Sequence, residues 1–229
     1  MKTNSLPAAL LGLSAALVMS TAGCAKSETP SESARFLSLP KDCAGLARPI
    51  DAALRQFSGQ LRDDRGENEF EESDLSPAPS PQYVRFLMCN ISYGDSSAPQ
   101  RRESGARPRS RFLTVTFTMD SSPGTPVSHA SESFGRYRDG FSRDKMMLNG
   151  IGDEAFTGVE SRSGDKVVVK TVFRISNLTV DVFATGSNFS GTDDVGITES
   201  PQLFSDVKSG AESIAKAIAD HIDDIMPAK

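Results

Sequence analysis

The 229-residue sequence contains few of the residues from which metal centres are usually built. It has two histidines, His129 and His221, and three cysteines, and no Cys-x-x-Cys pair occurs. Structural zinc sites need closely spaced cysteine and histidine ligands, whereas both histidines lie far from the cysteines in this sequence. We therefore predict no metal site, and no motif indicates a cofactor.

Catalytic motifs are also scarce. The sequence has no G-x-S-x-G, which marks the nucleophile of many hydrolases. Two groups of acidic residues occur near the C-terminus, but close spacing in sequence does not make carboxylates converge in a cleft. We interpret these groups as solvated and His221 as a packed or boundary histidine, so no catalytic residue is predicted. The acidic residues are Asp193, Asp194, Glu199, Asp220, Asp223 and Asp224.

The charge balance excludes a general nucleic-acid binder. Lys and Arg total 25 against 30 for Asp and Glu, a net charge of −5, so there is no overall basic field. One local basic cluster lies among Ser, Gly and Pro, and we interpret it as a solvated loop. Its members are Arg101, Arg102, Arg107, Arg109 and Arg111.

The N-terminus has an apolar run that is too short to span a membrane. The run from Leu6 to Met19 has about 14 residues, whereas a spanning helix needs roughly 20. It follows Lys2 and ends in small residues, as a secretory signal does. The small residues before Cys24 resemble the bacterial lipobox, whose cysteine takes a diacylglyceryl group. We predict a signal peptide over 1–23 and lipidation of Cys24; plain secretion and a buried N-terminal helix are the alternatives.

This prediction places the protein on the extracytoplasmic face of the cell membrane, held by its lipid. Residues 24–38 begin with small, polar and Pro-containing sequence, which indicates a flexible tether. Residues 39–229 then form a single globular envelope domain. Tryptophan is absent, but 13 phenylalanines and a hydrophobic content of 38% permit a packed core.

The remaining cysteines are Cys43 and Cys89. With Cys24 lipidated, two thiols are left in an oxidising compartment, and we predict that they form a disulfide. The bridge closes a loop of about 46 residues, worth roughly 4 kcal/mol in the chain-entropy model. Two buried free thiols are the alternative.

Hydrophobic periodicity predicts helices and strands in alternation. Helices are expected over 49–57, 125–141 and 203–225. Strands are expected over 82–93, 111–120, 166–175 and 178–185. The last two are joined by Ser176 and Asn177 as a hairpin, with Asn177 suited to positive φ. The order indicates an α+β fold: an antiparallel sheet of about four to six strands with helices packed on it and one disulfide.

The segment Gly150-Ile-Gly-Asp-Glu-Ala-Phe156 invites a phosphate-loop interpretation. A dinucleotide fingerprint needs a third glycine, and Ala155 stands at that position. We predict a structural turn instead: Gly150 and Gly152 supply unusual φ values, and Asp153 bonds local backbone. Ala155 and Phe156 are expected to enter the core.

Several of these features together resemble a family. They are Asp42-Cys43, Cys89, the Gly150–Phe156 segment, the Arg174–Val182 segment and the closing Ala/Ile-rich helix. The chain resembles an actinobacterial group of small lipoproteins with a domain of unknown function, and more distantly the extracytoplasmic sensor domain of PknH-type receptor kinases. The resemblance implies an envelope protein without an assigned reaction and supplies no catalytic residues.

Three functions remain open from the sequence. The first is a noncatalytic ligand-binding or sensing module, for a small ligand or peptide, anchored to the membrane. The second is an accessory subunit that docks on an envelope protein. The third is an envelope hydrolase, which would need a cleft holding a strongly perturbed histidine or carboxylate. We expect the domain not to be an enzyme.

Overall fold

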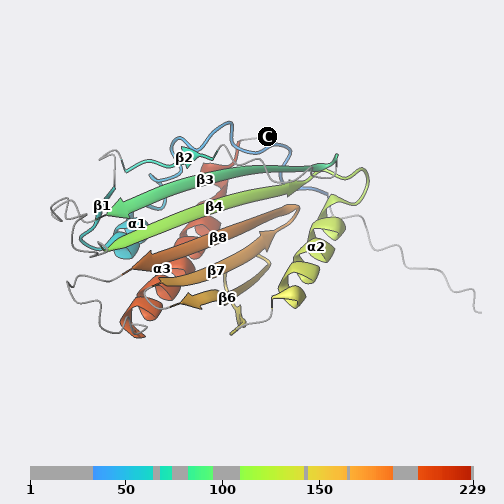
Figure 1. The fold of residues 1–229 in the computed structure, drawn as a ribbon. Coiled ribbons are helices and arrows are strands. Elements are labelled where there is room, and N and C mark those ends of the chain that lie inside the picture. The colour runs from blue at the N-terminus through green and yellow to red at the C-terminus, as the bar shows by residue number, and fades with distance from the viewer. Residues whose placement is uncertain are drawn as a thin grey trace, which may run out of the picture. The chain divides into compact units, whose positions relative to one another are not determined.

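The computed structural model describes residues 33–63, 68–73, 82–94, 109–141, 144–163, 166–187 and 201–227. They form an antiparallel sheet with helices packed on it, so the predicted α+β class is confirmed (Figure 1). The strand order is β1-β3-β4-β8-β7-β6-β5, with β2 paired to β3, which makes eight strands in the described part of the chain. The predicted four to six strands were therefore too few.

The elements have the following bounds. The helices are α1 Asp51–Ser58, α2 Pro126–Gly140, α3 Pro201–Asp220 and α4 Ile222–Ile225. The strands are β1 Arg62–Asp63, β2 Glu71–Glu72, β3 Val84–Gly94, β4 Ser110–Asp120, β5 Met146–Leu148, β6 Glu154–Ser163, β7 Lys166–Ile175 and β8 Leu178–Ser187.

Strand β4 lies between β3 and β8 and shows how one face of the sheet becomes a continuous buried apolar layer. Alternate side chains point to opposite faces of a strand. On β4 the inward set is fully buried, whereas the threonines between them are half-buried. The inward set is Leu113, Val115, Phe117 and Met119. Their neighbours on β8, such as Val180 and Val182, continue the same apolar layer.

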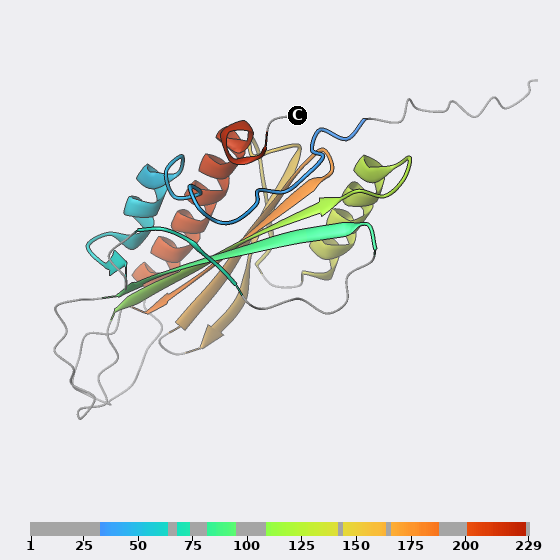
Figure 2. The same ribbon diagram turned by 90° about the horizontal axis from the view of Figure 1, so that it is seen from above.

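Helix α3 covers this layer. Its apolar stripe packs on β7 and β8, and α1 packs beside it on the same face (Figure 2). The stripe consists of Val207, Ala211, Ile214 and Ile218, all without exposed surface. Burying one Ile or Val side chain contributes about 1.5–3 kcal/mol. The helix stops at Asp220, so the predicted helix over 203–225 is interrupted at His221 before α4.

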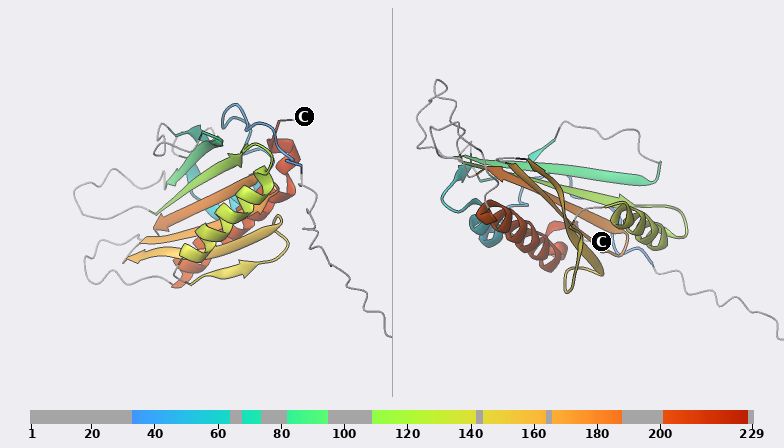
Figure 3. Two further views of the ribbon diagram at one scale, coloured as in Figure 1. Left: turned by 90° about the vertical axis from the view of Figure 1, so that its right-hand side faces the viewer. Right: turned by 60° about the horizontal axis from the view of Figure 1, so that its bottom comes forward.

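Helix α2 lies on the opposite face, across β4, β8 and β7 (Figure 3, left). Phe134 of this helix meets Phe156 of β6 edge-on, with ring centroids 5.6 Å apart. Both side chains and Val172 of β7 are buried in a second, smaller apolar cluster. This helix therefore gives β6 its packing partner on the outer face.

The disulfide predicted between Cys43 and Cys89 is confirmed. The two Cα atoms are 5.6 Å apart, and both residues are buried. The bridge ties the segment before α1 to the middle of β3. It thereby holds the first helix against the sheet.

The β7–β8 hairpin differs in one detail from the prediction. The positive φ falls on Ser176, at 54°, and not on Asn177. The Asn177 side chain is buried and used instead as a clamp. Its amide donates to the carbonyls of Phe36 (2.9 Å) and Asp120 (2.8 Å), and its oxygen accepts from the Phe36 amide (3.1 Å).

The clamp fixes where the N-terminal segment joins the fold. Phe36 is buried in the core, and Arg35 lies with its guanidinium 2.8 Å from Asp223. The packed part of the chain thus includes Phe36, three residues before the predicted boundary at residue 39. Cys24 lies outside the described residues.

The glycine segment before β6 forms a bend. Gly150 and Gly152 have φ of 75° and 59°, and a Cβ on Gly152 would lie 2.5 Å from the Arg174 carbonyl oxygen. The Asp153 carboxylate accepts a 2.7 Å hydrogen bond from the Ser176 amide. Ala155 and Phe156 are fully buried. These contacts tie the bend to the β7–β8 turn, which gives the segment a structural role.

Candidate functional site

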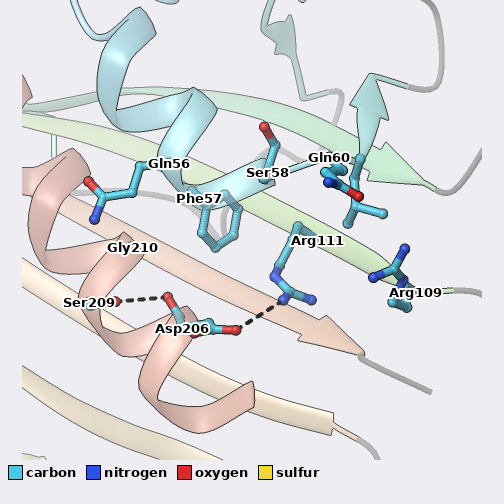
Figure 4. Close-up of a pocket in the computed structure, with 11 residues that line it drawn as sticks. Gln56, Phe57, Ser58, Gln60, Arg109, Arg111, Asp206, Ser209 and Gly210 are labelled. Atoms are coloured by element: carbon cyan, nitrogen blue, oxygen red, sulfur yellow. Dashed lines mark hydrogen bonds and ion pairs between the residues drawn. The ribbon is translucent and has the colours of Figure 1, made fainter. Parts of the chain in front are cut away.

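A polar cavity of about 500 Å³ lies where the end of α1, the start of β4 and helix α3 meet (Figure 4). Small-molecule sites commonly have volumes of about 300–1,000 Å³, so the cavity has room for a small ligand. A smaller cavity, of about 120 Å³, lies beside the disulfide. The larger cavity is the candidate site, because it alone of these two is large enough for a ligand of several atoms.

Arg111 forms the inner wall of the cavity. It is the second residue of β4 and alternates with the same set as Leu113 and Val115. Its side chain therefore points to the buried apolar face of the sheet. Only 7% of the residue is exposed. Its guanidinium Nη1 donates to the Ser110 carbonyl (2.9 Å) and the Ser187 carbonyl (3.2 Å).

A glycine makes room for this arginine. Gly186 of β8 lies directly opposite Arg111 in the β4–β8 pair. A Cβ at Gly186 would be 2.8 Å from the Arg111 Cδ and 2.9 Å from its Nη1. Real Cβ atoms do not approach other atoms so closely, and the side chain of Arg111 can therefore lie across β8 only because residue 186 is glycine.

Asp206 of α3 faces Arg111 across the cavity (Figure 4). Its Oδ2 lies 3.8 Å from the Arg111 Nη2, and its Oδ1 accepts a 2.6 Å hydrogen bond from Gln202. Burial lowers the pKa of the Arg111 guanidinium, whereas Asp206 acts in the opposite direction. Arginine stays charged at any physiological pH, so a nearly buried positive charge is maintained at this wall.

The opposite wall comes from the close approach of α1 to α3. Phe57 at the end of α1 packs against Gly210 of α3, where a Cβ would lie 2.5 Å from the Phe57 ring. The same ring meets Tyr93 of β3 edge-on at 6.5 Å. Gly59 ends the helix with a φ of 61° and turns the chain along the rim. These contacts hold the wall in place without filling the cavity.

The chemistry of the lining favours binding over catalysis. Among the described residues of the lining, the charged ones are Arg109, Arg111 and Asp206, a net charge of +1 (two arginines and one carboxylate), and the glutamines are Gln56 and Gln60. The lining hydroxyls are used within their own helices: Ser58 donates to the Arg55 carbonyl and Ser209 to the Asp206 carbonyl. Nucleophilic catalysis needs a hydroxyl or thiol beside a base, and the cavity lining holds no histidine.

The basic cluster of the sequence divides at this point. Arg101, Arg102 and Arg107 lie outside the described residues, whereas Arg109 and Arg111 line the cavity. The interpretation of Arg111 as part of a solvated loop is wrong, because strand β4 begins at Ser110 and buries it. The phase of the strand contained the missed signal: Arg111 lies two residues before Leu113, on the same face.

Neither histidine lines the cavity. His129 of α2 has its Nδ1 2.6 Å from Asp120 Oδ2 at the end of β4. Burial alone would raise the pKa of Asp120, but hydrogen bonds from His129 and Ser122 lower it overall. His221 pairs with Asp224 at 3.1 Å and keeps 47% of its side chain exposed next to the buried Ile222, so of the two expected positions, packed or boundary, it occupies the boundary.

The acidic residues that the structure describes near the C-terminus each pair with a different basic residue. Asp220 pairs with Lys216 at 2.9 Å on α3, and Asp223 pairs with Arg35. Asp193, Asp194 and Glu199 lie outside the described residues. Throughout the described ranges, no three His, Cys, Asp or Glu side chains are placed together as ligands of a metal ion.

A second polar cluster joins α2 to the outer face of the sheet. The Tyr137 hydroxyl donates to Asp181 (3.0 Å) and accepts from Lys170 (3.2 Å), and Lys170 also pairs with Glu160 (3.2 Å). Burial, reinforced by the charge of Asp181, raises the pKa of Tyr137 to about 12. Burial opposes the charge on Lys170, but Asp181 and Tyr137 raise its pKa overall. The cluster fastens the helix to the sheet.

Within the described residues, none of the helices is both long and apolar enough to cross a membrane. Comparisons of the chain with protein families, curated proteins and solved structures found no match.

Proposed function

We propose that this chain is an extracytoplasmic lipoprotein, anchored through Cys24, whose domain binds a small polar ligand in the cavity between α1, β4 and α3. Two features support export. The first 23 residues have the pattern of a secretory signal followed by a lipobox-like cysteine. The Cys43–Cys89 disulfide is of a kind that persists in oxidising compartments and is rare in the cytosol.

The observation that carries the binding function is the fixed position of Arg111. A nearly buried charge is costly to desolvate, yet here Gly186 and two backbone carbonyls hold the guanidinium at the wall of a cavity. Among its described residues, the cavity lining pairs no nucleophile with a base. A binding module without catalytic activity accounts for both features.

The fold also suggests how the anchored domain presents this cavity. The N-terminal segment is clamped at the β7–β8 turn, next to Asp120 at the end of β4, whereas Arg111 lies at the start of β4. Nine residues of strand separate these positions by about 30 Å. If the eleven residues from Cys24 to Arg35 are the flexible tether that the sequence predicts, their r.m.s. length is about 20 Å, which is shorter than this separation. The anchored chain would therefore enter at the end of the sheet opposite the cavity, which leaves the cavity accessible from outside.

Ligand binding is tested with paired substitutions on α3. Ser209 and Ser205 are both exposed, but only Ser209 lines the cavity. Ser209→Trp would fill the cavity, and Ser205→Trp is the matched control. A ligand at 100 times its Kd stabilises by about 2.7 kcal/mol, which raises the Tm of a domain of this size by roughly 5–10 °C. We expect a member of a panel of amino acids, sugars, sugar phosphates and organic acids to shift the wild type and Ser205→Trp, and not Ser209→Trp. Equal shifts in both variants, or none in the wild type, would count against the proposal.

Anchoring is tested by metabolic labelling with palmitate. The wild type is expected to incorporate the label into the membrane fraction, and Cys24→Ser to lose both label and membrane association. Anchoring through this cysteine would be excluded if the wild-type protein incorporates no label, or if Cys24→Ser still incorporates it.

Orientation is tested by energy transfer, because the native sequence has no tryptophan. A single donor is introduced as Asp224→Trp, beside the Asp223 that pairs with Arg35, or as Gln60→Trp at the cavity. With the lipidated protein in vesicles that contain dansyl-labelled lipid, transfer from position 224 should exceed transfer from position 60. Equal or reversed efficiencies would contradict the proposed orientation.

A further inference from the structure

We infer that the ligand of this cavity carries an oxyanion, a carboxylate or a phosphate group, that binds the guanidinium of Arg111 in place of Asp206. The inference rests on the proposed binding function and specifies its ligand class. It is carried by the geometry of Arg111, by the loose contact of Asp206, and by the charges of the lining.

The guanidinium of Arg111 is oriented for a ligand in the cavity. Its Nη1 is held by the carbonyls of Ser110 and Ser187, and Gly186 leaves the space in which it lies. The Nη2 is the atom that approaches Asp206 across the cavity. A planar guanidinium is well suited to carboxylate and phosphate oxygens. The protein therefore fixes the donor before any ligand arrives.

Asp206 behaves as a replaceable partner. The 3.8 Å between its Oδ2 and the Arg111 Nη2 exceeds the 3.5 Å limit of a hydrogen bond, whose usual N···O range is about 2.7–3.2 Å. The Asp206 side chain is 40% exposed, against 9% for Arg111. Gln202 already donates to the other carboxylate oxygen at 2.6 Å. Asp206 can turn toward solvent and retain this bond when a ligand oxyanion takes its place.

The rest of the lining agrees with an anion. Arg109 adds a second positive charge, and the side-chain amides of Gln56 and Gln60 can donate hydrogen bonds to a polar ligand. With Asp206 displaced, the charged residues that the structure describes in the lining are the two arginines, Arg109 and Arg111. An oxyanion would therefore gain more from this cavity than a neutral ligand of the same size.

The test is an NMR titration of the mature chain carrying Cys24→Ser, at pH 7 and constant ionic strength. Inorganic phosphate and succinate are the two probes, and N-acetylglucosamine is the neutral comparison. Each anionic probe replaces chloride at the same ionic strength, so general salt effects on the spectrum stay constant. The tighter of the two anions identifies the preferred group.

Asp206→Asn is the decisive variant, and Asp220→Asn is its control, because it makes the same charge change on the same helix away from the cavity. Removal of a like charge about 4 Å from the ligand should tighten anion binding about fivefold, the factor that ~1 kcal/mol represents. Asp220→Asn should change the affinity less than about twofold, because solvent and salt screen exposed charges. Arg111→Gln should weaken binding about tenfold or more.

Affinity that is unchanged or weaker in Asp206→Asn would overturn the inference, even if Arg111→Gln fails to fold. Chemical shifts that do not map to residues 109–111 and 206–210 would overturn it as well. A third outcome is that the wild type binds a neutral ligand but no anion, and that Ser209→Trp no longer binds this ligand. The inference of an oxyanion would then be wrong, whereas the proposed binding function would stand. If Ser209→Trp binds every probe with the same affinity as the wild type, the proposed binding function of the cavity is itself wrong.

Discussion

Replacing Gly186 with alanine is expected to destabilise the domain, although the same change in an ordinary strand interior stabilises it by about 0.5–1 kcal/mol. The added Cβ would lie 2.8 Å from the Arg111 Cδ, 2.9 Å from its Nη1 and 2.9 Å from the Ser110 carbonyl oxygen. Overpacking of this kind costs about 1–3 kcal/mol. We therefore predict a net loss of about 1–2 kcal/mol in the free energy of unfolding.

A double-mutant cycle separates the cost of the clash with Arg111 from the cost of the clash with the Ser110 carbonyl. If the buried arginine is what excludes a side chain at residue 186, Arg111→Ala should remove most of the cost of Gly186→Ala and leave the part due to the Ser110 carbonyl. Urea unfolding of the wild type, both single variants and the double variant gives the coupling energy. We expect about 1 kcal/mol or more, since contacting residues couple by about 0.5–3 kcal/mol.

Additive effects would refute this reasoning, because Gly186 would then not be what accommodates Arg111. The same cycle has a second readout. Gly186→Ala should weaken phosphate binding, because the displaced guanidinium no longer meets the ligand from its fixed position. Thr185 is half-exposed on the same strand, and Thr185→Ala is a control that should leave phosphate affinity unchanged.

Three further predictions concern the frame that holds the cavity. Breaking the Cys43–Cys89 bridge by double alanine substitution should lower the free energy of unfolding by about 4 kcal/mol, the chain-entropy value for a 46-residue separation, measured by urea unfolding. Asn177→Ala leaves the buried backbone groups of Phe36 without their partners and should cost at least about 2 kcal/mol, with faster hydrogen exchange at the Phe36 amide. Asp120 has a lowered pKa in the folded state, so its stabilisation is complete above its ordinary value of 3.8 and is lost as the pH falls through the lowered pKa. Unfolding measured at pH 6 and below pH 4 should therefore show a smaller acid-induced loss in Asp120→Asn than in the wild type, and equal losses would refute this assignment.

The strongest periodic segments were predictable from the sequence. On β4 an unbroken alternation of apolar residues and threonines leaves no ambiguity of face, and 203–225 has an apolar stripe that only a helix can bury on one side. The Cys43–Cys89 pairing followed from counting thiols in a chain that the sequence predicts to be exported. These features depend on local pattern or on arithmetic, which a single sequence provides.

Strands β5 and β6 were missed for a physical reason. In β6 the residues from Ala155 to Val159 are buried on both faces of the sheet. One face is the face that α3 covers, and the other packs against α2, so the sequence shows no alternation of apolar and polar residues there. Its second half contains Ser and Arg residues, which interrupt the apolar run. The sheet therefore appeared smaller in the sequence than it is.

The site was missed because its parts are distant in sequence. Phe57, Arg111, Gly186 and Asp206 come from four separate elements that only the sheet register and helix packing bring together. Arg111 stands among polar residues that resemble a loop. The phase of β4 could have indicated its burial, but nothing local predicts that a glycine on β8 lies opposite it.

The central claim, that this cavity holds a ligand, is tested most directly by native mass spectrometry of the protein purified from the cells that produce it. The account predicts an additional small-molecule mass on the wild type and on Ser205→Trp, and its loss from Ser209→Trp, whose indole fills the cavity. The same bound mass on Ser209→Trp would place the ligand elsewhere and contradict the account.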